Sequence, residues 1–169
     1  MPLIKDGAFV ADAYETVADD APLPDGGAIV SPMRFRAERD SLLARNAALG
    51  VRLKSSETPE VLGEDVHRLS VVVLEFPVFR DGRAFSWARM LRTRLKFAGE
   101  VRGVGHFLYD QIAHMRRVGF DAFEVPEGFA PAQYSRALGE ITNVYQPSAD
   151  TRETIFELRR GLRRNADIG

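Results

Sequence analysis

The sequence contains no cysteine. Disulfide bonds, thiolate nucleophiles and cysteine-ligated zinc or iron–sulfur sites are therefore excluded, whereas His or carboxylate metal sites and organic cofactors are not. It also lacks a run of about 18 apolar residues, and its N-terminal residues show neither the basic nor the apolar segment of a secretory signal. We expect a soluble, cytoplasmic protein without a membrane partner. Any redox role would need an electron carrier that the side chains of this protein do not supply.

The chain has little net charge, with a formal total of −1 over 169 residues. General binding to nucleic acid is therefore not expected. The charges are unevenly distributed, because residues 80–117 hold nine Lys/Arg and three acids, whereas residues 1–27 hold six acids and one lysine. A basic middle and an acidic start predict a small anion or an acidic partner near the middle of the chain.

Length and composition predict one domain. A chain with 45% hydrophobic residues and this length can bury one core but is short for two. We expect residues 1–27, which end in the turn sequence PLPDGG, to form an N-terminal appendage or hairpin. Residues 28–150 should form an α/β domain, and residues 151–169 a C-terminal helix.

Strand and helix signals alternate along the chain. Hydrophobic patterns predict a hairpin of residues 3–4 and 8–10, and strands at 28–31, 51–54, 69–76, 100–104, 122–125 and 142–145. They predict helices at 33–49, 85–97, 108–118, 131–141 and 151–164, with a helical turn at 58–59. Gly50 is expected to end the first of these helices. Because short β–α–β spacing favours right-handed crossovers, we expect a mostly parallel sheet of about five strands with flanking helices, either open and doubly wound or a partial barrel.

The strongest strand signal is LSVVVLEF at residues 69–76. A continuous apolar run is typical of a central strand that is buried on both faces. Glu75 interrupts the run near its carboxyl end, so it should reach the functional edge or pair with an arginine such as Arg83. Ligands of parallel α/β sheets bind at the carboxyl ends of the strands, where residues 77–86, 103–108 and 126–129 should meet.

The first of these segments contains candidate anion-binding residues. Arg83 follows the turn pair Asp81–Gly82 and precedes a helix, so its guanidinium could hold a phosphate, sulfate or carboxylate beside the free helix amides. Ser86 caps that helix or lies in its first turn, and Arg89 starts a basic stripe that continues at positions 92 and 96. The same stripe is typical of a solvated helix face that forms ion pairs.

The second segment, residues 102–106, reads RGVGH between a predicted strand and a predicted helix. Phosphate-binding glycines occupy such positions, but position 108 is Leu, so the third glycine of the dinucleotide fingerprint is missing. A tight turn with close helix–strand packing is the competing interpretation. His106 is the acid–base or anion-contact candidate. The predicted anion or substrate site comprises Arg83, Ser86, Arg89, Arg102, Gly105 and His106.

No catalytic residue and no cofactor can be assigned from these patterns. Asp110 and His114 lie four residues apart on one helix, but a metal site needs at least about three ligands, so no metal site is predicted. The C-terminal segment carries Ile155, Leu158 and Leu162 at helical spacing among arginines. Such a helix either docks on its own domain or binds a partner, and self-association into a homo-oligomer is left open.

Residues 79–123 resemble the signature region of a bacterial family, domain of unknown function 934. The resembling pieces are Asp81-Gly82-Arg83, Phe85-Ser86, Ala88-Arg89, Leu91-Arg92, Arg94, Gly99-Glu100, Arg102, Val104-Gly105, Asp110-Gln111, Arg116 and Gly119-Phe120-Asp121-Ala122-Phe123. The family usually has an acidic residue where this chain has His106, so the resemblance assigns no catalytic role to that position.

Members of this family are described as oxidoreductases involved in sulfite reduction. The resemblance therefore implies a link to assimilatory sulfite reductase, or to another sulfur-assimilation protein, as a partner. Two classes of function follow from it. The protein is either an enzyme or electron-delivery component that binds an anionic substrate or a flavin or nicotinamide phosphate, or a non-catalytic subunit that docks on sulfite reductase.

Overall fold

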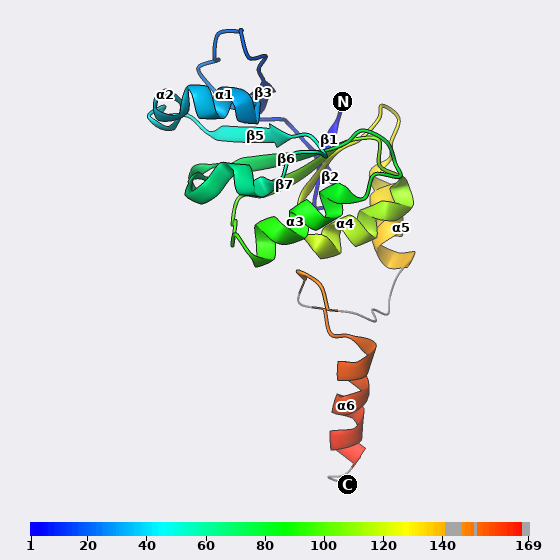
Figure 1. Ribbon diagram of the computed structural model, residues 1–169. Helices are drawn as coiled ribbons and strands as arrows, with labels where there is room; N and C mark the ends of the chain where they lie inside the picture. The colour runs from blue at the N-terminus through cyan, green and yellow to red at the C-terminus, as the bar shows by residue number, and fades with distance from the viewer. Residues whose placement is uncertain (141–146, 151, 167–169) are drawn as a thin grey trace.

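A computed structural model describes residues 1–140, 147–150 and 152–166, and its strands form a single sheet (Figure 1). The sheet order is β2-β1-β8-β7-β6-β5-β4-β3. β3 to β8 run parallel, whereas β1 pairs antiparallel with both β2 and β8. The strands are β1 (Leu3–Lys5), β2 (Ala8–Val10), β3 (Tyr14–Thr16), β4 (Gly27–Val30), β5 (Leu49–Leu53), β6 (Val71–Phe76), β7 (Glu100–Gly105) and β8 (Ala122–Glu124).

The predicted α/β class is confirmed, but the prediction of about five strands was wrong. Within the described residues the sheet is mixed and has eight strands. The difference comes from residues 1–27: the expected hairpin forms as β1 and β2, but it joins the sheet through β8, and residues 14–16 add β3. The sequence YET of β3 is short and shows no apolar alternation, so its pattern carried no strand signal.

The helices up to residue 140 cover one face of the sheet. The helices of the described chain are α1 (Pro32–Ala37), α2 (Arg39–Leu43), α3 (Arg83–Thr93), α4 (Ile112–Val118), α5 (Pro131–Glu140) and α6 (Ile155–Ala166), with the 3-10 helices η1 (Pro59–Arg68) and η2 (Tyr109–Gln111). Buried residues of α1 to α5 and η1 share one core with the side chains of one sheet face. A doubly wound sheet would have helices on both faces, so the structure decides for the partial barrel.

The connection between β2 and β3 shows how strongly the sheet curls. These two strands are the opposite edges of the sheet, yet only residues 11–13 join them. Four residue steps span at most about 14 Å, whereas a flat sheet of this size would be about 34 Å across. The two edges therefore approach each other, and the sheet curls into a half-barrel with the helices outside (Figure 1).

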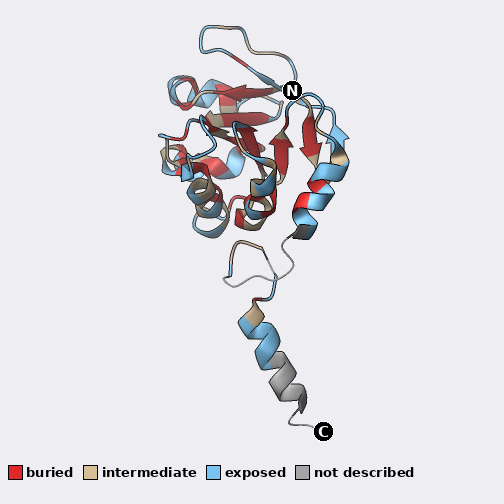
Figure 2. Ribbon diagram, turned by 90° about the vertical axis from the view of Figure 1, so that its right-hand side faces the viewer, coloured by how far each residue is buried: buried red, intermediate tan, exposed pale blue. Residues whose placement is uncertain are grey.

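β6 is the centre of this half-barrel, as its sequence predicted. It pairs in parallel with β5 and β7. Val72 and Leu74 face the helices, and Val71 and Val73 face the inside of the curl, where they pack with residues of β4 and β7. All four are at most 2% exposed. Figure 2 shows the buried strands enclosed by the partly exposed helices.

Residues 33–50 differ from the expected single helix. The helix breaks at Glu38, whose φ of −113° and ψ of 21° are not helical, and α2 ends at Leu43. Leu49 and Gly50 belong to β5 and pair with Ala28 and Ile29 of β4. Gly50 therefore does not end a helix. A side chain there would collide with Val71 on the neighbouring strand, so the glycine permits close strand packing.

The C-terminal helix α6 extends away from the half-barrel (Figures 1 and 2). Thr154 and Glu157 form a capping box at its start: Glu157 accepts a 2.7 Å hydrogen bond from the Thr154 backbone N–H, and the Thr154 hydroxyl accepts one from the Glu157 N–H. Of the remaining predicted elements, the strand at 142–145 lies outside the described residues. Within the described part of the chain, no helix is long and apolar enough to cross a membrane.

Candidate functional site

The basic charge of residues 80–117 is largely paired with acids of the same chain. Arg92, for example, donates to the carbonyls of Phe97, Gly99 and Gly119 and pairs with Asp121. Ion pairs with carboxylates also involve Arg83, Arg94, Arg102, Arg116 and Arg117. Most of the local excess charge therefore stabilises turns and strand ends. Arg80, Arg89 and Lys96 differ, because within the described residues they have no ion pair.

Arg102 lies inside the half-barrel and is only 1% exposed. Its guanidinium bonds Asp12 at 2.7 Å and Glu100 at 3.0 Å, and Glu124 lies 3.9 Å away. Burial lowers the pKa of Arg102, but Asp12 and Glu100 outweigh this effect and raise it above its usual value. The chain's own carboxylates thus occupy the positions that an external anion would need around this arginine.

Arg83 is placed at the start of α3, on the helical side of the sheet, and the structure does not bring it together with Arg102. It bonds both carboxylate oxygens of Asp81, at 2.9 and 2.7 Å, and the hydroxyl of Ser55 at 3.0 Å. The bonded guanidinium holds the pKa of Asp81 well below its usual range. This bidentate pair fixes the loop that leads from β6 into α3.

Gly105 and His106 lie at the end of β7 beside an apolar hollow of about 560 Å³, lined by Pro77, Val78, Phe79, Arg80 and His106. The His106 backbone N–H donates to the Phe76 carbonyl at 2.8 Å. Gly105 has a φ of +94°, and a side chain there would collide with the same carbonyl. The glycine therefore permits a tight turn and close packing, the competing interpretation of this segment.

Ser86 and Arg89 are the two predicted residues that the structure brings together in one cavity. Both lie on α3, Ser86 in its first turn and Arg89 one turn later. With His114 and Arg117 of α4 they line a hollow of about 180 Å³ between the two helices. Neither His114 nor Arg117 was among the predicted site residues.

A third cavity opens where β3, β4, β5 and β6 end. Its volume is about 480 Å³, and we call it the carboxyl-edge cavity. It is lined by Thr16, Val17, Ala18, Asp19, Val30, Ser31, Pro32, Met33, Arg52, Lys54, Glu57 and Glu75. This position and volume are typical of ligand sites in parallel α/β sheets.

The rim of the cavity is rigidly tied to the sheet. The Val17 N–H donates to the Ile29 carbonyl at 2.9 Å and so extends the pairing of β3 with β4. Ser31 caps α1 by accepting from the Arg34 N–H, and its hydroxyl donates to Asp19 at 2.6 Å. Buried Arg34 donates to the Ala18 carbonyl at 2.6 Å. Residues 17–19 are therefore held in place before any ligand arrives.

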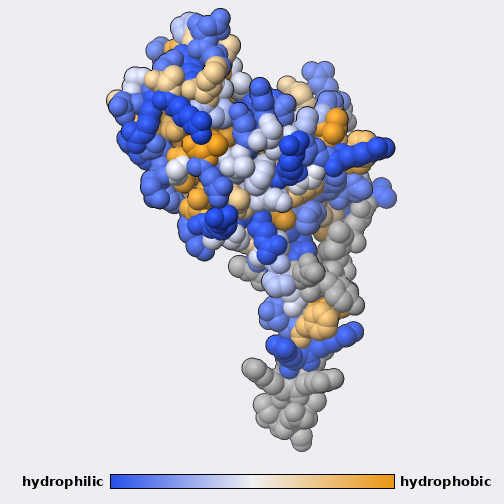
Figure 3. All heavy atoms as spheres, in the orientation of Figure 1, coloured by the Kyte–Doolittle hydropathy of each residue, from blue (hydrophilic) through white to orange (hydrophobic). Residues whose placement is uncertain are grey.

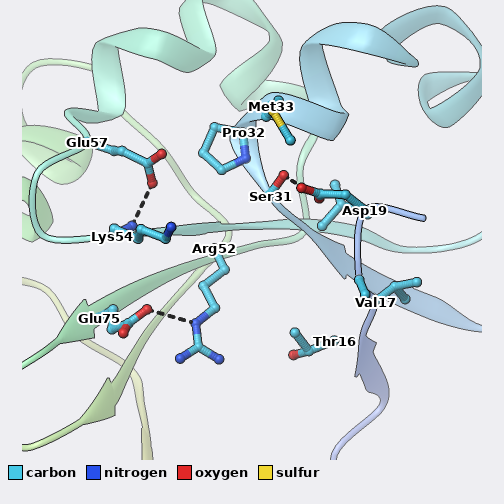
Figure 4. Close-up of a pocket in the computed structure, with 12 residues that line it drawn as sticks. Thr16, Val17, Asp19, Ser31, Pro32, Met33, Arg52, Lys54, Glu57 and Glu75 are labelled. Carbon is cyan, nitrogen blue, oxygen red and sulfur yellow. Dashed lines mark hydrogen bonds and ion pairs between the residues drawn. The ribbon is translucent and has the colours of Figure 1, made fainter. Parts of the chain in front are cut away.

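Two cationic side chains in the carboxyl-edge cavity retain donors that no described residue of the chain accepts from. Arg52 bonds Glu75 through Nε at 3.2 Å, and its two terminal nitrogens point into the space between Glu75 and Thr16 (Figure 4). Glu57 accepts from the Lys54 backbone N–H at 2.8 Å, and within the described residues the Lys54 ammonium has no ion pair. The site thus offers the free edge of a guanidinium and an ammonium group.

The cavity combines these donors with apolar walls. Val17, Val30, Pro32 and Met33 supply aliphatic surface, and the three carboxylates already accept bonds from Ser31, Lys54 and Arg52. An anionic group can therefore bind at Arg52, with the apolar surface available to the rest of a ligand.

Neither Arg52 nor Lys54 was among the residues predicted from the sequence. Arg52 lies in β5 and Lys54 directly follows it, positions that carry no functional signal, and the other residues that line the cavity come from β3, β4, α1, β6 and the adjacent loops. Glu75 was the usable signal, because a carboxylate in a buried strand predicts a cationic partner. It does reach the functional edge and pair with an arginine as expected, but that arginine is Arg52 and not Arg83.

Comparison with known proteins gives one result. No curated protein and no solved structure is similar enough to this chain to be matched. Residues 50–156, which include β6 to β8, nearly all of β5 and the helices α3 to α5, match the family described as "Bacterial protein of unknown function (DUF934)". Because the match covers more than half of the 169 residues, the chain belongs to this bacterial family.

Proposed function

We propose that this protein is a component of assimilatory sulfite reduction and that it binds its anionic ligand in the carboxyl-edge cavity. The role in sulfite reduction rests on the description attached to the family that the sequence resembles. The cavity rests on the geometry, and the observation that carries it is the free terminal edge of Arg52 in a cavity that is also lined by Lys54, whose ammonium has no ion pair within the described residues.

The residues of the cavity suit an oxyanion of the sulfite class. A guanidinium can donate two parallel N–H bonds to two oxygens of one anion, and Lys54 adds a point charge. Glu75 holds Arg52 at Nε, so the orientation of the guanidinium is fixed before the ligand binds. The chain's part in this proposal is to bind and orient the anion.

The cavity is larger than sulfite alone requires. Its volume of about 480 Å³ falls within the usual range of pockets for small organic molecules and cofactors. The apolar wall formed by Val17, Pro32 and Met33 can therefore accept an organic body that carries an anionic group. A flavin or nicotinamide phosphate belongs to this class of ligand.

The visible spectrum of the purified protein and its effect on sulfite reductase test this function. A catalytic or electron-delivery component will increase the rate of sulfide formation by the reductase when sulfite is limiting, and a bound flavin will absorb in the visible range. A colourless protein that leaves this rate unchanged at every concentration contradicts the catalytic version of the proposal.

A docking subunit is the second candidate, and α6 favours it. Phe156 is 54% and Leu158 43% exposed, although both are apolar. Figure 3 shows an apolar spot among hydrophilic side chains on the part of the molecule formed by α6. A helix that displays apolar residues beside arginines can bind an apolar groove with an acidic rim on another protein. We propose that this groove lies on sulfite reductase.

A further inference from the structure

The hollow between α3 and α4 lies outside the carboxyl-edge cavity and has a different chemistry. α3 supplies Ser86 and Arg89, which are three residues apart and so share one helix face. α4 supplies His114 and Arg117 at the same spacing. Pro147 and Ser148 complete the lining, and the 180 Å³ volume leaves room for one small ion with water but not for a nucleotide.

Cationic groups dominate this hollow. Arg89 has no ion pair within the described residues, and Arg117 pairs with Asp150 at 3.2 Å. No carboxylate belongs to the lining itself. The Ser86 and Ser148 hydroxyls can each donate a hydrogen bond. The hollow therefore gathers donors and positive charge without an internal anion to balance Arg89.

The segment that covers the hollow is fixed to α4. The Ala149 and Asp150 backbone N–H groups both donate to the Arg117 carbonyl, at 3.1 and 3.2 Å. The Asp150 carboxylate also forms an ion pair with the side chain of Arg117. Residues 147–150 thus have a defined position across the two helices, and Ser148 is held at the opening.

We infer that this hollow is a binding site for a single inorganic oxyanion, phosphate or sulfate. Arg89 would donate to its oxygens, the two serine hydroxyls would complete the hydrogen bonds, and Arg117 would add positive potential. The inference does not depend on the carboxyl-edge cavity or on any part in sulfite reduction. It also gives a role to Arg89, the arginine of α3 that has no carboxylate partner within the described residues, whereas Arg83 and Arg92 of the same helix are paired.

His114 provides a spectroscopic reporter of the site. Its ring lies 5.1 Å from that of Phe85, and burial, aided by the charge of Arg117, lowers its pKa. The charged groups around it are Arg117 on its own helix, Asp110 one turn earlier, Arg89 on α3 and Asp150 on the covering segment. An anion in the hollow would offset the two arginines and let the imidazole bind a proton more easily.

The test is a titration of His114 by NMR in the full-length protein. Sulfate or phosphate should raise its pKa relative to chloride at equal ionic strength. Arg89→Gln should weaken sulfate binding at least about tenfold, because a charged hydrogen bond is lost. Arg94→Gln is the matched control. Arg94 is the C-cap residue of the same helix, but it pairs with Glu60 and does not line the hollow.

A further binding measurement distinguishes a free inorganic anion from a phosphoryl group on a larger molecule. Phenyl phosphate should bind at least about tenfold more weakly than phosphate, because the hollow admits one small ion. Tighter binding of phenyl phosphate overturns the assignment to an inorganic ion. Identical His114 titrations in sulfate and chloride, or equal sulfate affinities of the Arg89 and Arg94 variants, overturn the site itself.

Discussion

Asp12 accepts a 2.7 Å hydrogen bond from Nη1 of Arg102, which lies ninety residues further along the chain. Asp12 belongs to the three-residue connection between the two edge strands, and Arg102 is buried inside the half-barrel. This ion pair therefore anchors the segment that brings the two edges together. Tyr14, whose ring centre is 5.6 Å from the same guanidinium, adds a cation–π contact at the start of β3.

Replacing Asp12 by Asn should lower the free energy of unfolding by about 1–3 kcal/mol, the usual effect of weakening a charged hydrogen bond to a buried group. Glu100 and Glu124 still neutralise Arg102, so the protein should remain folded. Urea denaturation measures the change. Asp20→Asn, in an exposed turn of the same N-terminal region, serves as the control. Equal stabilities of the two variants would refute the anchoring role.

Val72→Asp should prevent folding or destabilise the protein by several kcal/mol, because it places an unpaired charge in the fully buried centre of β6. The matched control is Val78→Asp, since Val78 is 55% exposed two residues after the same strand. Expression of soluble protein and thermal denaturation distinguish the two. A Val72→Asp protein that melts like the control contradicts the central position of β6.

The stability of the protein should fall as the pH is lowered through the range in which His114 titrates. Burial, with Arg117, depresses the pKa of this imidazole below 6.5, so the unfolded chain binds more protons than the folded one. The contribution of His114 is fully present above pH 6.5 and is lost as the pH falls through the folded pKa. Urea denaturation at pH 7.5 and pH 5.5 should therefore show that the free energy of unfolding falls less between these two pH values in His114→Gln than in the wild type. An equal loss would mean that His114 is not the responsible group.

Deleting residues 151–169 should leave the melting temperature almost unchanged, because Phe156 and Leu158 are exposed in the structure. If α6 serves a partner, the same deletion should abolish co-purification with sulfite reductase or self-association. A large drop in melting temperature would instead show that the tail belongs to the core, since three buried aliphatic side chains would contribute roughly 4.5–9 kcal/mol at about 1.5–3 kcal/mol each.

The parallel part of the fold was predictable from the sequence because local patterns encode it. The apolar run of β6 and the end of α4 at Val118 lie where periodicity placed them, whereas α3 begins two residues before and ends four residues before its predicted bounds of 85–97. The closure of the half-barrel was not predictable. It depends on the contact between Asp12 and Arg102, and no local pattern links residues so far apart.

The candidate site was predictable only in part, for a similar reason. The sequence placed anion-binding residues at strand–helix junctions, where parallel sheets bind ligands, and the carboxyl-edge cavity lies at that edge. Whether an arginine is available depends on its neighbours in space. Arg83 and Arg102 are paired with acids of their own chain, whereas Arg52 keeps its terminal nitrogens free.

Arg52→Lys should weaken binding of an oxyanion in the carboxyl-edge cavity by about tenfold while it preserves the charge. Lysine cannot donate two parallel bonds, and it would have to choose between Glu75 and the ligand. Sulfite titrations of the wild type and the variant check this expectation. Equal affinities would mean that only the charge of Arg52, and not its forked geometry, is used.

Isothermal titration calorimetry of Lys54→Gln with sulfite tests whether the carboxyl-edge cavity binds an oxyanion. Lys54 has no ion pair within the described residues, so its replacement should not change the melting temperature, and Lys96→Gln applies the same change at an exposed lysine outside the cavity. The account predicts that sulfite binds the wild type and Lys96→Gln equally and binds Lys54→Gln about 10- to 100-fold more weakly, the loss of one charged contact. Equal binding by all three proteins, or no binding by the wild type, would contradict it.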